Sequence, residues 1–287
     1  MSRYKGDILM LLCTICWGTS YLFIKIATRT LSTFNLMAFR FTLAFILTAL
    51  VYRTALRRLN RGGVGYGVLL GATLFCSNAL LTFGLQTTTI GNAGFLIGLT
   101  VVFVALIQTV LDRAWPGRYL LIGLVLSVLG IGVLTLSMEF RMHLGDALCI
   151  LCAFVFAVYI FIVGKAARNH DPAGVCVVHF GVTGLLAWAA ALLFGTVVFP
   201  ADATTLLATC CLAVFGSVIG TISQLVGQRY ATPTRAAFIF TLEPLFAILF
   251  ACLFAGEELS LRTVLGGGLL LAGVYVSEYR PKRAEER

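Results

Sequence analysis

Two side chains stand in apolar stretches where a charge is costly. Glu243 precedes Pro244 in the apolar run 236–255, and Arg40 lies in the run 34–52. A charged group in hydrocarbon is unfavourable unless it is protonated, paired or hydrated. Glu243 is therefore a candidate to bind a proton or a cationic group, or else a structural acid bonded to neighbouring helices. Arg40 either pairs with Glu243, holds a carboxylate, or extends its charge to the nearer interface.

Pro244, directly after Glu243, predicts a bend in the helix. It is the only one of the six prolines that falls inside an apolar run. Proline has no N–H to donate to the carbonyl of Phe240, so a helix bends there. The bend makes this segment a candidate gate. The matching residues earlier in the chain, Thr100-Val101, contain no proline, and the sequence leaves open whether the run 91–111 is kinked.

Aromatic and polar side chains at helical spacing complete the candidate binding set. Trp17, Ser20 and Tyr21 lie at i, i+3 and i+4 and so share one helix face. Aromatic faces with hydroxyl groups suit an amphipathic solute, although ordinary packing produces the same pattern. The predicted binding residues are Trp17, Ser20, Tyr21, Asn78, Phe95, Thr100, Phe103, Tyr159, Gln224, Glu243 and Phe246.

The composition makes lipid the solvent of this chain. Of 287 residues, 60% are hydrophobic and 11% are charged, and the mean hydropathy is +0.98. A soluble domain carries roughly 25% charged residues, so no soluble fold could bury this much apolar surface. The net charge of +9 would suggest nucleic acid in a soluble protein. Here the basic residues lie between apolar runs, which argues against a nucleic-acid partner.

Ten apolar runs of membrane-spanning length follow one another, and lipid requires each to be an α-helix. They lie at 7–26, 34–52, 64–85, 91–111, 119–138, 145–164, 174–199, 205–226, 236–255 and 262–279. The connections on one side hold sixteen of the 21 Lys and Arg residues, and those on the other hold Lys25, Arg29, Arg141 and Arg262. This bias predicts a multi-pass inner-membrane protein with both termini cytoplasmic.

The chain repeats itself at offsets of 139 to 143 residues. Gly6-Asp7-Ile8-Leu9 returns as Gly145-Asp146-Ala147-Leu148 at the first offset, and Gly84, Gly123 and Gly130 return as Gly227, Gly266 and Gly273 at the second. Each half, 1–138 and 139–287, has five spans, so the second half must insert upside down. We predict an all-α membrane protein of ten transmembrane helices in two inverted five-helix repeats. Such repeats are typical of carriers with a site near mid-membrane.

Short motifs in a fixed order extend over nearly the whole chain. They are Trp17-Gly18-Thr19-Ser20, Arg40-Phe41, Gly84-Leu85-Gln86-Thr87-Thr88-Thr89, Leu242-Glu243-Pro244-Leu245-Phe246 and Gly256-Glu257-Glu258-Leu259-Ser260. Together they resemble the ten-helix EamA type of the drug/metabolite transporter superfamily. The resemblance implies a secondary transporter that exports or exchanges amino acids or related metabolites by alternating access. It also implies a central cavity lined mainly by the first, third, fourth, sixth, eighth and ninth helices.

His179, in the run 174–199, could couple such transport to protons because imidazole titrates near neutral pH. A hydrogen-bonded structural histidine is the alternative. With Arg40 and Pro244 it forms the predicted gating or coupling set. Asp7 and Asp146 are expected only to complement the positive ends of their helices.

Signals for other chemistry are weak. The sequence contains no phosphate-binding loop and no nucleophile–His–acid arrangement, so we expect no enzyme, cofactor or metal site. The pairs Cys13/Cys16 and Cys149/Cys152 are expected to be small packing residues. An intramembrane enzyme acting on lipid and a non-transporting sensor are the alternatives to a carrier. The expected partners are a small-molecule substrate and the bilayer. The glycine-rich faces of the fifth and tenth helices could pack internally or form a homodimer.

Overall fold

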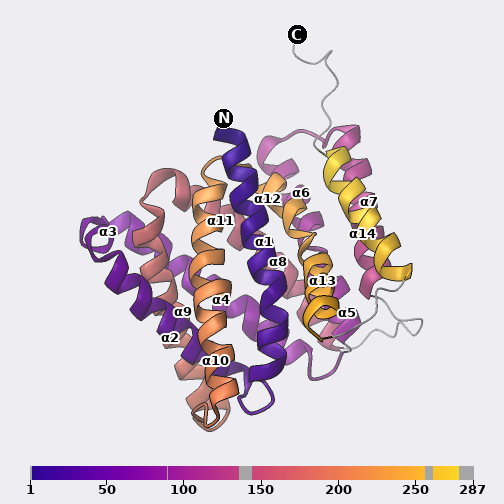
Figure 1. The fold of residues 1–287 in the computed structure, drawn as a ribbon. Helices are drawn as coiled ribbons and strands as arrows, with labels where there is room; N and C mark the ends of the chain where they lie inside the picture. The colour runs from indigo at the N-terminus through magenta and orange to yellow at the C-terminus, as the bar shows by residue number, and fades with distance from the viewer. Residues whose placement is uncertain (1, 89, 136–143, 256–260, 278–287) are drawn as a thin grey trace.

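The computed structural model describes residues 2–88, 90–135, 144–255 and 261–277, and helices dominate these ranges (Figure 1). The motif at 256–260 and Arg141 lie outside the described residues. The helices of the first half are α1 (Ser2–Ala27), α2 (Thr33–Val51), α3 (Arg53–Arg58), α4 (Arg61–Gly84), α5 (Ile90–Gly98), α6 (Thr100–Asp112) and α7 (Arg118–Thr135). Those of the second half are α8 (Leu144–Asn169), α9 (Pro172–Phe194), α10 (Ala203–Cys211), the π-helix η1 (Leu212–Ile219), α11 (Gly220–Gln228), α12 (Pro233–Phe240), α13 (Glu243–Ala255) and α14 (Leu261–Ser277).

The predicted spans appear as helices in the predicted order. Within the described ranges, eight helical stretches are long and apolar enough to cross a membrane. Two shorter apolar helices, Arg118–Leu134 and Leu261–Ser277, occupy the fifth and tenth predicted positions. The all-α membrane fold is therefore confirmed, with two of its ten predicted spans shorter than the others.

Polar residues in the connections start the helices. The side chain of Ser32 accepts a hydrogen bond from the backbone N–H of Asn35 at the start of α2, and Asp171 accepts one from Ala173 at the start of α9. These caps satisfy amides that have no partner within their own helix. Ser32 and Asp171 are 139 residues apart, so the repeat offset places α2 and α9 in the same register.

The fourth and ninth apolar runs, each expected to be one helix, are both interrupted. The ninth run breaks between α12 and α13, directly before Glu243 and Pro244, which confirms the predicted kink. The fourth run breaks between α5 and α6, directly before Thr100, although no proline is present. The hydroxyl of Thr100 donates to the carbonyl of Ile97 at 2.7 Å and so satisfies a carbonyl at the break.

Two pairs of glycines show the inverted relation of the halves directly. A Cβ atom built on Gly6 of α1 would lie 3.2 Å from the carbonyl oxygen of Gly227 of α11. One built on Gly84 of α4 would lie 3.0 Å from the carbonyl oxygen of Gly145 of α8. The offsets convert Gly6 into Gly145 and Gly84 into Gly227, so the two close approaches are copies of each other.

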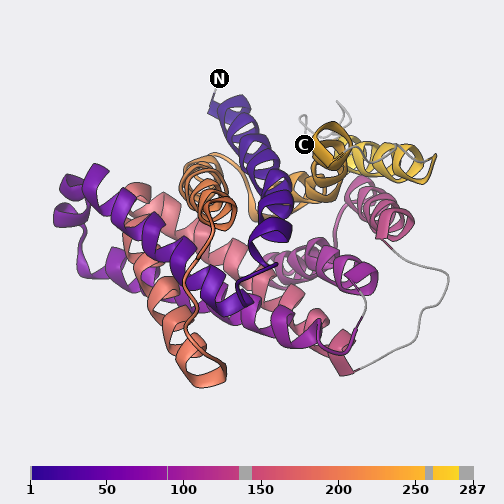
Figure 2. The same cartoon turned by 60° about the horizontal axis from the view of Figure 1, so that its bottom comes forward.

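The helices α7 and α14 form a pair at one edge of the bundle (Figures 1 and 2). They cross where Gly123 meets Gly273 and where Gly130 meets Gly266, and the offset of 143 exchanges these two contacts. The glycine-rich faces of the fifth and tenth helices therefore pack against each other within the chain. Small residues at the crossing let the two backbones approach closely.

Candidate functional site

A cluster of polar side chains lies where α1, α2, η1 and α13 meet. The Arg40 Nε atom donates to the hydroxyl of Ser217 at 2.7 Å, and the Nη2 atom of Arg40 lies beside Gly216. Glu243, at the start of α13, is close enough to act electrostatically on Arg40. Ser217 is a partner of Arg40 that the sequence did not indicate.

Trp17 joins this cluster from α1. Its indole nitrogen donates to the carbonyl of Gly216 at 3.1 Å, and its ring lies 5.2 Å from that of Phe240 and 6.0 Å from that of Phe156. Ser20, which is buried, donates to the carbonyl of Cys16 one turn before it. The side chain of Tyr21, the third member of the predicted face, lies outside the described residues.

The π-helix η1 supplies Gly216 and Ser217 to the cluster. A π-helical turn is wider than an α-helical turn and is found often at functional sites. The residues of this segment, Leu212–Ile219, have no proline and no sequence signal that separates them from an α-helix. The sequence therefore did not predict the π-helix.

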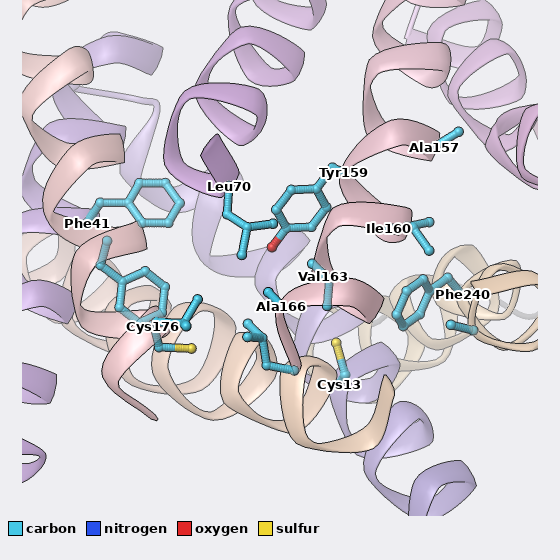
Figure 3. Close-up of a cluster of buried hydrophobic side chains, with 14 of the residues drawn as sticks. Cys13, Phe41, Leu70, Ala157, Tyr159, Ile160, Val163, Ala166, Cys176 and Phe240 are labelled. Atoms are coloured by element: carbon cyan, nitrogen blue, oxygen red, sulfur yellow. The ribbon is translucent and has the colours of Figure 1, made fainter. Parts of the chain in front are cut away.

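Tyr159 of α8 lies within the buried hydrophobic cluster drawn in Figure 3, and a second polar cluster lies around it. The Tyr159 hydroxyl donates to Oε1 of Gln224 at 3.3 Å, and the ring of His179 lies 5.8 Å from the tyrosine ring. Gln228, one turn along α11, donates to the carbonyl of Ile160 at 3.2 Å. His179, Gln224 and Gln228 are completely buried. Three predicted residues therefore meet here, and Gln228 joins them.

The predicted polar residues of the fourth and third helices have structural partners. Thr100 of α6 donates to the carbonyl of Ile97 on α5, across the break, and reaches the carbonyl of Ala153 on α8 at 3.3 Å. Asn78 donates to the carbonyl of Leu74 one turn earlier in α4. Each of these contacts fixes a helix or joins two of them.

The three predicted phenylalanines pack against apolar side chains. Phe103 meets the ring of Phe154 edge-on at 5.7 Å. Phe95 and Phe246 pack against a buried group formed by Ile131, Leu242 and Leu270. The structure thus distributes the predicted binding residues over two polar clusters and several packing sites.

Cavities open at both ends of the bundle. We call the end with the N-terminus and Arg58, Lys165, Arg168 and Arg229 the basic end. A cavity of about 1000 Å³ lies there between α6, α8 and α12, and its lining includes Gln108, Phe161, Lys165, Thr232, Arg235 and Phe238. A cavity of about 690 Å³ at the opposite end is lined by Ser32, Phe83 and Phe194, among others. Among the described residues, none of the predicted binding residues lines either of these two cavities.

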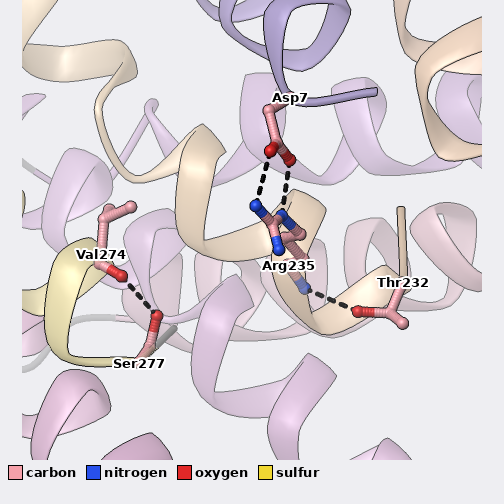
Figure 4. Close-up of polar contacts among 5 residues, drawn as sticks. All are labelled: Asp7, Thr232, Arg235, Val274 and Ser277. Carbon is pink, nitrogen blue, oxygen red and sulfur yellow. Dashed lines mark hydrogen bonds and ion pairs between the residues drawn. The ribbon is translucent and has the colours of Figure 1, made fainter. Parts of the chain in front are cut away.

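An ion pair closes the packing at the basic end (Figure 4). Arg235 of α12 contacts the carboxylate of Asp7 of α1 through Nε and Nη2, each at 2.5 Å. At the opposite end, the hydroxyl of Thr88 donates to the carboxylate of Asp146, the repeat counterpart of Asp7. The expectation that these two acids serve only their helix ends is wrong, because each joins one half to the other.

Comparison with known proteins places the chain in a family. The model of the EamA-like transporter family matches residues 4–136 and again residues 143–279. A protein of Archaeoglobus fulgidus named "Uncharacterized transporter" is 30% identical, over 95% of this chain and 97% of its own length. A protein of Escherichia coli K12 named "Probable amino-acid metabolite efflux pump" is 27% identical, over 97% and 96% of the two chains.

A solved crystal structure shares the fold. It superposes with a TM-score of 0.85 over 99% of this chain and 100% of its own, at 18% sequence identity. The family model matches two successive ranges of the chain, and the paired glycine contacts join residues of one range to residues of the other. The chain belongs to the EamA-like transporter family and is a membrane transporter.

Proposed function

We propose that the protein is a secondary carrier that moves an amino acid or a related small metabolite by alternating access, without altering it chemically. The observation that carries this proposal is the position of Arg40 and Glu243. They come from different halves of the chain, and their opposite charges interact at the packed layer between the two end cavities. A zwitterionic solute offers a carboxylate to the arginine and an ammonium group to the glutamate, so it satisfies both charges.

Trp17 and Ser20 complete this binding site in the proposal. The indole of Trp17 already lies against Phe240 and Phe156, and it offers an apolar surface beside the two charges. Ser217 orients the guanidinium through its 2.7 Å hydrogen bond. The predicted residues Tyr21, Asn78, Phe95, Thr100, Phe103 and Phe246 line the path in conformations that open the packed layer.

Alternating access requires two halves that move as units. We propose the repeats 1–138 and 139–287 as these units, supported by family matches at 4–136 and 143–279. The interrupted ninth helix, with Pro244 at the break, serves as a gate. Both termini are cytoplasmic in the inner membrane, because the basic end carries the majority of the arginines and lysines. A relative named as an amino-acid metabolite efflux pump supports export of an amino acid.

Counterflow in proteoliposomes tests the proposal. Vesicles are loaded with one of the twenty common L-amino acids, the same compound is supplied outside in labelled form, and the pH is equal on both sides. We expect accumulation of at least one label, and loss of that accumulation in Glu243→Gln and Arg40→Gln. The control is Arg29→Gln, an exposed arginine between α1 and α2. Counterflow of none of the twenty compounds, or full activity of either cluster variant, overturns the proposal.

A further inference from the structure

Arg40 and His179 occupy the same position in the two repeats. Each lies eight residues after the cap of its helix, Ser32 for α2 and Asp171 for α9. Their neighbours Phe41 and Phe180 stack on each other at 6.1 Å, which sets both residues beside the axis that relates the halves. Because α2 starts at the end opposite to α9, the two residues lie about 12 Å in from opposite ends of the bundle.

The surroundings of His179 leave several polar atoms unused. Among the described residues, neither ring nitrogen of His179 has a hydrogen-bond partner, and the same holds for Nε2 of Gln224 and Oε1 of Gln228. All three side chains are completely buried. Buried polar groups in folded proteins are nearly always hydrogen-bonded, so the unpaired donor of Gln224, the unpaired acceptor of Gln228 and the unpaired imidazole of His179 require an explanation. The unpaired atoms of His179, Gln224 and Gln228 could form hydrogen bonds with a water molecule, and the imidazole could bind a proton.

The groups that face His179 cannot compensate a positive charge in this conformation. The helix α9 packs against α2, α3, α4, α8 and α11. The titratable and charged side chains on these helices and on α9 itself are Arg40, Arg53, Arg57, Arg58, Arg61, Tyr66, Cys76, Cys149, Cys152, Tyr159, Lys165, Arg168 and Cys176, with Asp146 and Asp171 at helix starts. Tyr159 is the one with a ring contact to His179.

The two carboxylates at helix starts are already engaged. Asp146 accepts from Thr88 at the far end of the bundle, and Asp171 caps α9 about 12 Å along the helix from His179. An imidazolium would therefore be buried without a counter-ion, which is strongly unfavourable. Protonation must favour a conformation that brings water to this position.

We propose that His179 is a proton-binding site in the half of the pathway that opens at the basic end, the titratable counterpart of the fixed charge of Arg40. Binding of a proton there favours opening of the cavity between α6, α8 and α12, and water then reaches Tyr159, Gln224 and Gln228. The proposal rests on the alternating access of the proposed function and is independent of its substrate.

Hydrogen–deuterium exchange of the full chain in lipid nanodiscs tests this site without any substrate. Exchange is measured at about pH 8 and about pH 5.5, either side of the ordinary range of histidine, and corrected for the intrinsic rate. The reporters are α12 and residues 161–169 of α8, which border the larger cavity. We expect several-fold faster exchange in both segments at the lower pH.

Variants at one position separate His179 from other acid effects. His179→Asn, neutral at both pH values, should show equal exchange, and His179→Lys should show fast exchange at both. His170→Asn is the matched control: this histidine lies at the basic end, beside Tyr66, and its variant should respond to acid as the wild type does. An acid response that survives in His179→Asn, or slow exchange at both pH values in His179→Lys, overturns the assignment. Counterflow at equal pH is a separate measurement, so either result can fail alone.

Discussion

Asp7 and Arg235 join the first helix of one half to the interrupted ninth helix of the other through two charged contacts of 2.5 Å. Their side chains are 24% and 18% exposed, so water screens the pair only in part. Two parallel contacts between a guanidinium and a carboxylate are stronger and more directional than one. We call this pair the latch, because it joins α1 of one half to α12 of the other at the basic end.

A double-mutant cycle measures this latch. Asp7→Asn, Arg235→Gln and the double variant are compared by the free energy of unfolding in a detergent titration. We expect a coupling energy of about 1–2 kcal/mol, because removal of either partner leaves the other partly buried without its counter-charge. Additive single effects would mean that the two residues contribute independently and that no latch exists.

The sequence predicted most of the helices but not the breaks within them. Apolar runs, positive charge and an odd number of spans per half predicted the helices, their order and their inversion, because lipid leaves few alternatives. The sequence did not decide whether the helix breaks before Thr100, because no proline is present there to indicate a break. The π-helix at 212–219 was missed because hydrogen-bond register has no compositional signal.

The binding residues were harder to predict than the helices. Arg40 and Glu243 were identified because a charged residue in an apolar run is conspicuous. The partnership of Asp7 with Arg235 was missed because it links residues 228 positions apart on different helices. Periodicity identifies a helix face, but it does not state which other helix that face meets.

Gly273 tests the crossing of α7 and α14. A Cβ atom there would lie 2.9 Å from the carbonyl of Gly123 and would collide with the side chain of Ser127. We expect Gly273→Ala to destabilise the protein by about 1–3 kcal/mol, since neither backbone can retreat without moving its helix. Gly268→Ala in the same helix is the control, because no atom lies within 4 Å of its added Cβ. Equal melting temperatures for the two variants would contradict the role of the crossing.

Asp202 provides a pH test outside the membrane-spanning segments. Hydrogen bonds from Thr205, including one of 2.7 Å from its backbone N–H, lower the pKa of this exposed carboxyl. A carboxyl with a lowered pKa stabilises the folded form above the ordinary aspartate value of about 3.9, and this contribution disappears as the pH falls through the lowered value.

The expected result is local. Amide protection in the first turn of α10 should be constant from neutral pH to about pH 4 and should decrease below it. Asp202→Asn retains an N-cap acceptor but cannot titrate, so its protection should show no acid step. Hydrogen exchange of residues 204–207 gives the answer. An identical acid step in the variant would assign the effect to another group.

Arg40 and Ser217 allow charge and geometry to be separated. Arg40→Lys keeps the positive charge but loses the planar fork, of which Nε bonds Ser217 while Nη2 lies beside Gly216. A lysine cannot reproduce both contacts. We therefore expect counterflow of whichever amino acid the counterflow screen identifies to fall by at least about tenfold, which corresponds to about 1.4 kcal/mol.

Ser217→Ala should have a smaller effect, because the guanidinium remains and loses only its 2.7 Å partner. Its signature should be a raised half-saturation concentration with an unchanged maximal rate, since a less ordered arginine binds the carboxylate less well in every conformation. Ser127→Ala is the matched control: Ser127 is buried on α7, and its hydroxyl has no hydrogen-bond partner among the described residues. If Ser127→Ala and Ser217→Ala change the half-saturation concentration equally, the effect belongs to helix packing and Ser217 does not orient Arg40.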